Sequence, residues 1–133
     1  MRTVLLLALV SVGCTKDGGS CETDSDCGSD VCARDGICYP ADEVRQIRVT
    51  WTVDGQPASE TTCANAPDLY AQFDDDVQND GIGFAPVPCR AGIFSVDKMP
   101  SRFQSVSLGI DNGGELVVGS FDADGHVTFD LPL

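Results

Sequence analysis

The segment from Gln46 to Val53 reads QIRVTWTV, and it decides the fold of the chain. Every second residue in it is apolar: Ile47, Val49, Trp51 and Val53. Successive side chains of a β-strand point to opposite faces, so this alternation predicts a strand with one buried face. Trp51 is the largest side chain on that face, and we expect it to anchor the core.

Further strand signals, separated by turns rich in Asp, Asn, Gly and Pro, continue to the end of the chain. The segments concerned are Asp68–Phe73, Ile82–Cys89, Ile93–Val96, Arg102–Ile110, Glu115–Phe121 and His126–Leu131. Pro86 and Pro88 confine one of them to a sheet edge or to an irregular strand. No long stretch has helical periodicity. The pattern predicts an all-β protein, with an antiparallel β-sandwich over residues 46–133.

The other end of the chain has the composition of an export signal. A basic start precedes an apolar run, Val4–Val12, which is too short to span a bilayer. We therefore expect residues 1–13 to be a signal peptide.

The residues after the apolar run, Val10-Ser11-Val12-Gly13-Cys14, resemble the lipobox of bacterial lipoproteins. The resemblance implies that Cys14 is lipidated and becomes the mature N-terminus. Ser11 stands where the family usually has Leu. Thr15, in place of an Asp, favours the outer membrane over retention in the inner one. The alternative is a secreted protein in which Cys14 pairs with another cysteine.

The number of cysteines agrees with lipidation. The chain has seven, an odd number for an exported protein. If Cys14 carries lipid, six remain for three disulfides. Two of these six, Cys63 and Cys89, are the only cysteines of the predicted sandwich, and we expect them to pair.

The other four cysteines lie in residues 21–39, which follow a short tether, residues 14–20, and precede a linker, residues 40–45. They are Cys21, Cys27, Cys32 and Cys38. So few apolar residues accompany them that the segment needs disulfides to hold a shape. Of the three possible pairings we favour Cys21–Cys32 with Cys27–Cys38. Zinc is the alternative, but zinc modules generally use tighter Cys pairs.

Two further resemblances concern the body of the chain. Asp26-Cys27, Cys32 and Asp35-Gly36-Ile37-Cys38 resemble the short Cys-rich knots found in lipoproteins of myxobacteria and their relatives. Residues 46–133 resemble transthyretin-like (prealbumin-like) domains, which are related to carboxypeptidase regulatory-like modules. Met99-Pro100-Ser101-Arg102-Phe103 carries that likeness, with Arg102 where such domains often have Gly. An Ig-like sandwich remains the alternative.

The chain is strongly acidic, with 21 acidic residues, eight basic residues and a formal charge of −13. Such a surface repels phosphate backbones, so we do not expect nucleic acid as a partner. Six aspartates could meet at one end of the sandwich and bind calcium: Asp74, Asp75, Asp76, Asp80, Asp122 and Asp124. The alternative is that they are solvated loop residues. The acidic run 24–30 fits tight turns better than a calcium loop.

No catalytic constellation is evident. His126 is the only histidine, and it adjoins a turn, where we expect it to be exposed. We therefore expect no enzyme and no obligatory cofactor, but a non-catalytic interaction or structural module anchored to the membrane of the cell envelope. Its partner would be another envelope protein or a glycan. The alternatives are a calcium-dependent or carbohydrate-binding module and, third, a small hydrolase.

Overall fold

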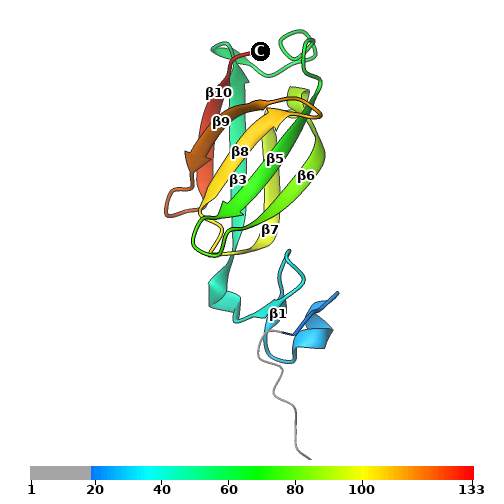
Figure 1. The fold of residues 1–133 in the computed structure, drawn as a ribbon, viewed down its shortest axis with the longest axis vertical. Helices are drawn as coiled ribbons and strands as arrows, with labels where there is room; N and C mark the ends of the chain where they lie inside the picture. The colour runs from blue at the N-terminus through cyan, green and yellow to red at the C-terminus, as the bar shows by residue number, and fades with distance from the viewer. Residues whose placement is uncertain (1–18) are drawn as a thin grey trace, which may run out of the picture.

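The computed structural model describes residues 19–133, so the predicted signal peptide and Cys14 lie outside the described residues. The described chain has two parts, a small N-terminal module and a larger body of strands (Figure 1). Within the described residues, no helix is long and apolar enough to cross a membrane.

The body is a sandwich of two sheets, as predicted, and we call residues 44–133 the sandwich. Its strands are β3 (Val44–Val53), β4 (Gln56–Pro57), β5 (Asp68–Asp75), β6 (Asp80–Pro88), β7 (Ile93–Pro100), β8 (Ser105–Ile110), β9 (Glu115–Ser120) and β10 (His126–Leu131). One sheet has the order β6-β5-β8-β9 and faces the viewer in Figure 1. The other has β3 at its centre, paired with β10, β4 and β7.

One strand pair differs from the predicted antiparallel arrangement. β10 runs parallel to β3, with Phe129 opposite Trp51, whereas the other strand pairs of the described residues are antiparallel. Parallel neighbours need a long connection between them. Here the connection is almost the whole sandwich, because β3 is its first strand and β10 its last.

The core lies between the two sheets. The alternating apolar residues of β3 are all buried, and Trp51 also donates a hydrogen bond from Nε1 to the Cys89 carbonyl at 2.8 Å. From the facing sheet, Phe73 packs edge-on against Phe84, with ring centroids 5.6 Å apart, and stacks on Phe121 at 6.0 Å. Trp51 is therefore part of the core, as its position in the pattern predicts.

The strand with two prolines lies at a sheet edge, as predicted. β6 pairs with β5 alone, so Pro86 and Pro88 need not donate to a second neighbour. A single turn of 3-10 helix, η3 (Cys89–Ala91), follows it. Cys89 is bonded to Cys63, and both residues are buried.

Several predicted boundaries differ from the structure. β7 runs to Pro100, whereas the predicted strand ends at Val96. β3 begins at Val44, so the last two residues of the expected linker, 44 and 45, belong to the strand. Most of the remaining linker forms the 3-10 turn η2 (Ala41–Glu43). β8 begins at Ser105 and not at Arg102, because residues 100–103 form a turn closed by a hydrogen bond from the Phe103 N–H to the Pro100 carbonyl. The strands β5 and β6 extend into the expected acidic connection between them.

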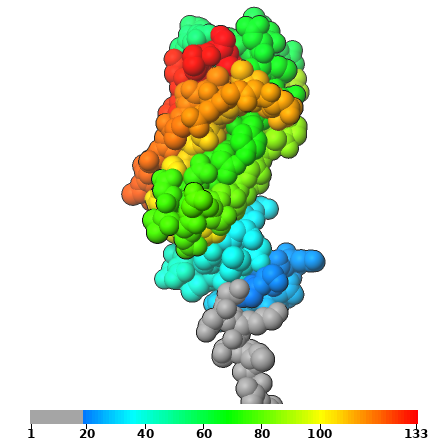
Figure 2. Space-filling view, in the orientation of Figure 1, coloured from blue at the N-terminus to red at the C-terminus, as the bar shows by residue number. Residues whose placement is uncertain are grey.

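The N-terminal module, residues 21–39, is the knot. It contains the 3-10 turn η1 (Asp24–Cys27) and a two-strand ladder of β1 (Val31–Cys32) and β2 (Cys38–Tyr39). Its disulfides are Cys21–Cys32 and Cys27–Cys38, the pairing that we favour from the sequence. Figure 2 shows the knot against one end of the sandwich, opposite the C-terminus.

Candidate functional site

The contact between the knot and the sandwich is centred on Arg102. This residue lies in the turn between β7 and β8, where the neighbouring Met99, Pro100 and Phe103 are buried. The guanidinium lies over the Phe103 ring, 4.2 Å from its centroid. Burial of its neighbours holds the turn in place and directs the charge of Arg102 toward the knot.

Arg102 binds four side chains from three parts of the chain. Nη1 donates to Asp75 at 2.9 Å, and Nη2 donates to Asp80 at 2.7 Å, at the turn between β5 and β6. Nη2 also donates to Asp35 of the knot at 3.2 Å, and Nε donates to the Tyr39 hydroxyl at 3.2 Å. Tyr39 in turn donates to Asp35 at 2.7 Å. We call these five residues the Arg102 cluster.

The Arg102 cluster is partly shielded from water, which strengthens its electrostatics. The side chains of Asp75 and Asp35 are 3% and 7% exposed, and that of Arg102 is 17% exposed. Hydrogen bonds from Arg102 lower the pKa of the Asp75 and Asp80 carboxyls below the usual value. Burial disfavours the charged form of Arg102 and by itself would lower the pKa of this residue. The hydrogen bonds to its four partners have the larger effect, so the pKa of Arg102 is raised. Burial also raises the pKa of Tyr39, as does its bond to Asp35.

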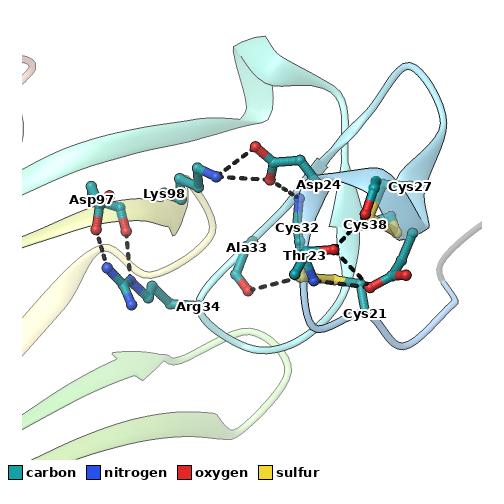
Figure 3. Close-up of polar contacts among 12 residues, drawn as sticks. Cys21, Thr23, Asp24, Cys27, Cys32, Ala33, Arg34, Cys38, Asp97 and Lys98 are labelled. Atoms are coloured by element: carbon teal, nitrogen blue, oxygen red, sulfur yellow. Dashed lines mark hydrogen bonds and ion pairs between the residues drawn. A yellow bond between two sulfur atoms is a disulfide. The ribbon is translucent and has the colours of Figure 1, made fainter.

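A second group of contacts joins the knot to the end of β7 (Figure 3). The Arg34 guanidinium pairs with the Asp97 carboxylate, and Arg34 Nε donates to the Asp97 carbonyl at 3.1 Å. Lys98 Nζ lies 2.7 Å from both carboxylate oxygens of Asp24, which also accepts the Cys32 N–H at 3.0 Å. We call these four residues (Arg34, Asp97, Lys98 and Asp24) the Lys98 contact.

A polar cavity of about 570 Å³ lies at the Lys98 contact, between the knot and the sandwich. Both cations in its wall, Arg34 and Lys98, are already paired with aspartates of that wall. Hydrogen bonds from these cations hold the pKa of Asp97 and of Asp24 below the usual value. The cavity therefore offers no free cation to a ligand, and its charged groups serve to join the two parts.

The six predicted calcium ligands do not meet at one place: Asp74, Asp75, Asp76 and Asp80 line one polar cavity of about 300 Å³ at the β5–β6 turn, whereas Asp122 and Asp124 are not part of its lining. The β5–β6 and β9–β10 turns lie at the same end of the sandwich, as expected (Figure 1). However, Asp75 and Asp80 bind Arg102, and Asp122 accepts the backbone N–H groups of Asp124 and His126. These backbone hydrogen bonds lower the pKa of Asp122.

Within residues 19–133, just one group of three potential metal ligands lies within 4.8 Å of one another: Cys21, Cys27 and Cys32. Their sulfurs are consumed by disulfides, so they are not the thiolates that zinc needs. Neither metal hypothesis from the sequence therefore finds an assembled ligand set in the described part of the chain.

His126 is exposed at the start of β10, where the sequence predicts it. Its backbone N–H donates to Asp122 at 2.8 Å, and no hydrogen bond to its ring is present among the described residues. The structure does not place it in a Ser-His-Asp arrangement.

Asp75 and Asp80 are among the calcium ligands predicted from the sequence, but their contact with Arg102 was not predicted, and neither were the other members of the Arg102 cluster. One signal could have pointed to them: the chain has eight basic residues against 21 acidic ones, so the position of each cation is informative. Arg102 also lies among Met99, Pro100 and Phe103, which are buried, and a charge in such a place usually has partners.

Fold and contacts together define the class: an all-β protein whose small disulfide-bonded module is docked on a two-sheet sandwich. No family model matches the chain, and no curated protein or solved structure is significantly similar to it. The resemblances to lipoproteins and to transthyretin-like domains remain predictions from the sequence.

Proposed function

We propose that this chain is an exported protein, lipid-anchored at Cys14 to a bacterial membrane, that acts as a non-catalytic binding module of the cell envelope. The observation that carries the proposal is the pairing of all six cysteines of the described residues. Disulfides persist in oxidising compartments outside the cytoplasm. Complete pairing also leaves Cys14 as the one cysteine of the chain that is available for lipid.

The position of the knot supports an anchor at that end. The described chain begins at the knot, at the pole opposite the C-terminus (Figure 1). A lipid on Cys14 would hold the knot close to the bilayer and direct the sandwich away from it. Two or three acyl chains suffice for this, because each buried CH₂ group contributes about 0.8 kcal/mol. Thr15 after the cysteine favours the outer membrane.

The choice of a non-catalytic role rests on the absence of an assembled reactive group in the described residues. The cysteines there are bonded, and the His126 ring is exposed and lies outside any triad. The partner would be an uncharged or basic molecule of the envelope, a protein or a glycan, since the acidic surface repels nucleic acid and other polyanions.

Membrane fractionation with detergent-phase partition tests the anchor. We expect the wild-type protein in the membrane and the detergent phase, with a mass at the mature N-terminus that includes diacylglyceryl on Cys14. Cys14→Ser should move the protein to the soluble fraction. Ser11→Leu is the matched control, because it restores the usual lipobox residue and should retain anchoring. If wild type and Cys14→Ser partition alike, the anchor is excluded.

A further inference from the structure

The sheet with the order β6-β5-β8-β9 carries a row of polar side chains on the outer face of β5. Tyr70, Gln72 and Asp74 occupy alternate positions and are half-buried. The Tyr70 hydroxyl donates to Gln72 Oε1, and Gln72 Nε2 donates to Asp74 Oδ1 at 3.2 Å. This chain of hydrogen bonds fixes the orientation of the Gln72 amide.

Two glycines of β6 let these side chains lie flat on the sheet. A Cβ atom at Gly83 would lie 2.6 Å from the Tyr70 hydroxyl oxygen and 3.0 Å from Cε2 of its ring. A Cβ atom at Gly81 would lie 2.1 Å from Gln72 Nε2. Neither glycine has a positive φ, so space and not backbone conformation explains them. Glycine weakens a strand interior and is typical of places where another group approaches closely.

A groove of about 290 Å³ runs along the other flank of Tyr70 and Gln72. Its remaining lining is Ser107, Gly109, Ile110, Gly113, Gly114 and Glu115, from β8, β9 and the turn between them. Gly109 is opposite Tyr70 in the β5–β8 register, so no side chain from that position covers the ring. The groove thus combines an aromatic ring, an amide, a hydroxyl and a carboxylate on a rigid sheet.

We propose that this groove binds an uncharged saccharide, with one sugar ring stacked on Tyr70. The face of an aromatic ring is negative and attracts the weakly positive C–H groups of a pyranose. Sugar hydroxyls both donate and accept hydrogen bonds. The two N–H groups of the Gln72 amide already donate to Asp74 and to the Phe73 carbonyl, so Gln72 offers a sugar the second lone pair of Oε1. Ser107 offers a hydroxyl, and Glu115 offers a charged acceptor that strengthens a hydrogen bond. Its volume of about 290 Å³ is close to the lower limit for small-ligand pockets, about 300 Å³.

The charge of the groove selects among saccharides. Glu115 is its one carboxylate and it contains no cation, while the whole chain carries −13. A uronic acid or a sulfated sugar would therefore be repelled, whereas a neutral hexose would not. The inference deepens the proposed function, and rests on it, by naming the ligand class of the binding module. It does not depend on the lipid.

Affinity measurements on the exported, oxidised full-length protein test the inference. The probes are immobilised hexasaccharides of glucose, mannose, xylose and N-acetylglucosamine, with oligogalacturonate as the anionic probe. We expect at least one neutral probe to bind and the anionic probe not to bind. Tyr70→Ala should weaken binding by roughly tenfold or more, and Tyr70→Phe, which keeps the stacking surface, by less.

Two further variants keep the result interpretable. Glu115→Ala removes an exposed carboxylate without touching the core, so it should fold and weaken binding severalfold even if Tyr70→Ala is unstable. Thr128→Ala, on the outer face of the other sheet, is the control and should bind as wild type does. Binding of no neutral probe, or binding by Glu115→Ala and by folded Tyr70→Ala that equals binding by the wild type, overturns the saccharide site. Neither result alters the fractionation of Cys14→Ser, so the two proposals fail separately.

Discussion

The knot and the sandwich are held together by different physics. The core cluster of buried apolar residues lies entirely in the sandwich, around β3 and β5. In the knot only Ala33 and Cys38 are buried among its apolar residues. Two disulfides in its 19 residues, Cys21–Cys32 and Cys27–Cys38, and its contacts with the sandwich take the place of a core. A segment this short cannot bury enough apolar surface to fold by itself, so disulfide bonds stabilise it in place of a hydrophobic core.

The largest effect should come from the core of the sandwich. Trp51→Ala removes a buried ring and its hydrogen bond to the Cys89 carbonyl, and we expect it to lower the free energy of unfolding by about 3–5 kcal/mol. Urea unfolding followed by circular dichroism measures this. Val118→Ala, at a position 59% exposed, is the control and should change stability by less than about 0.5 kcal/mol. Similar costs for the two variants would contradict the assignment of the core.

Breaking a disulfide should act on the knot alone. The double variant Cys27→Ser, Cys38→Ser removes one disulfide of the knot. We expect the local stability of the knot to fall by about 3 kcal/mol, since this bond restricts the conformations of the unfolded segment. The sandwich should keep its fold, because its core contains no residue of the knot. Hydrogen exchange resolved by segment tests this comparison: fast exchange in residues 21–39 with protected amides in β3 and β5 is expected. Loss of protection in both parts would show that the sandwich depends on the knot.

Arg102 provides the next test, because it couples the two parts. Arg102→Met leaves the carboxylates of Asp75 and Asp35 without their cation, and we expect a cost of about 2 kcal/mol, with the knot released from the sandwich. Limited proteolysis between the knot and β3 should become faster. Arg48→Met, at an exposed position of β3, removes the same charge and is the control. Equal proteolysis of the two variants would rule out this role for Arg102.

The same comparison explains what the sequence predicts and what it does not. The alternation from Ile47 to Val53 predicts the central strand, because it is a local pattern. The four cysteines of the knot lie close together in the chain and allow just three pairings, and the one that we favour is observed. The Arg102 cluster joins residues up to 67 positions apart, Asp35 and Arg102. No local sequence pattern predicts a contact between residues so far apart, and none predicts the parallel pairing of β3 with β10.

The pH dependence of stability tests the role of Arg102 as the partner of Asp75 and Asp80. Hydrogen bonds from Arg102 lower the pKa of Asp75 and Asp80, so the folded state binds fewer protons than the unfolded state. The stability from these carboxyls is therefore complete above their unfolded pKa, about 4, and is lost as the pH falls through the lower folded values. We expect the free energy of unfolding of the wild type, measured with urea, to decrease as the pH falls below about 4, and its difference from that of Arg102→Met to shrink there. A constant difference would contradict this assignment.

The smallest expected effect is that of calcium on the melting temperature. It tests whether the Arg102 guanidinium neutralises the carboxylates that a calcium ion would otherwise bind. In the wild type, Asp75 and Asp80 already bind Arg102, so millimolar calcium should raise the melting temperature by less than about 1 °C. In Arg102→Met the same carboxylates lack a cation, and calcium should then stabilise the variant more than it stabilises the wild type. Magnesium, which demands stricter geometry, is the matched control. If calcium raises the melting temperature of the wild type more than that of Arg102→Met, the acidic end of the sandwich binds an ion despite Arg102. That result would support the calcium-dependent alternative, which the arrangement of the side chains does not support.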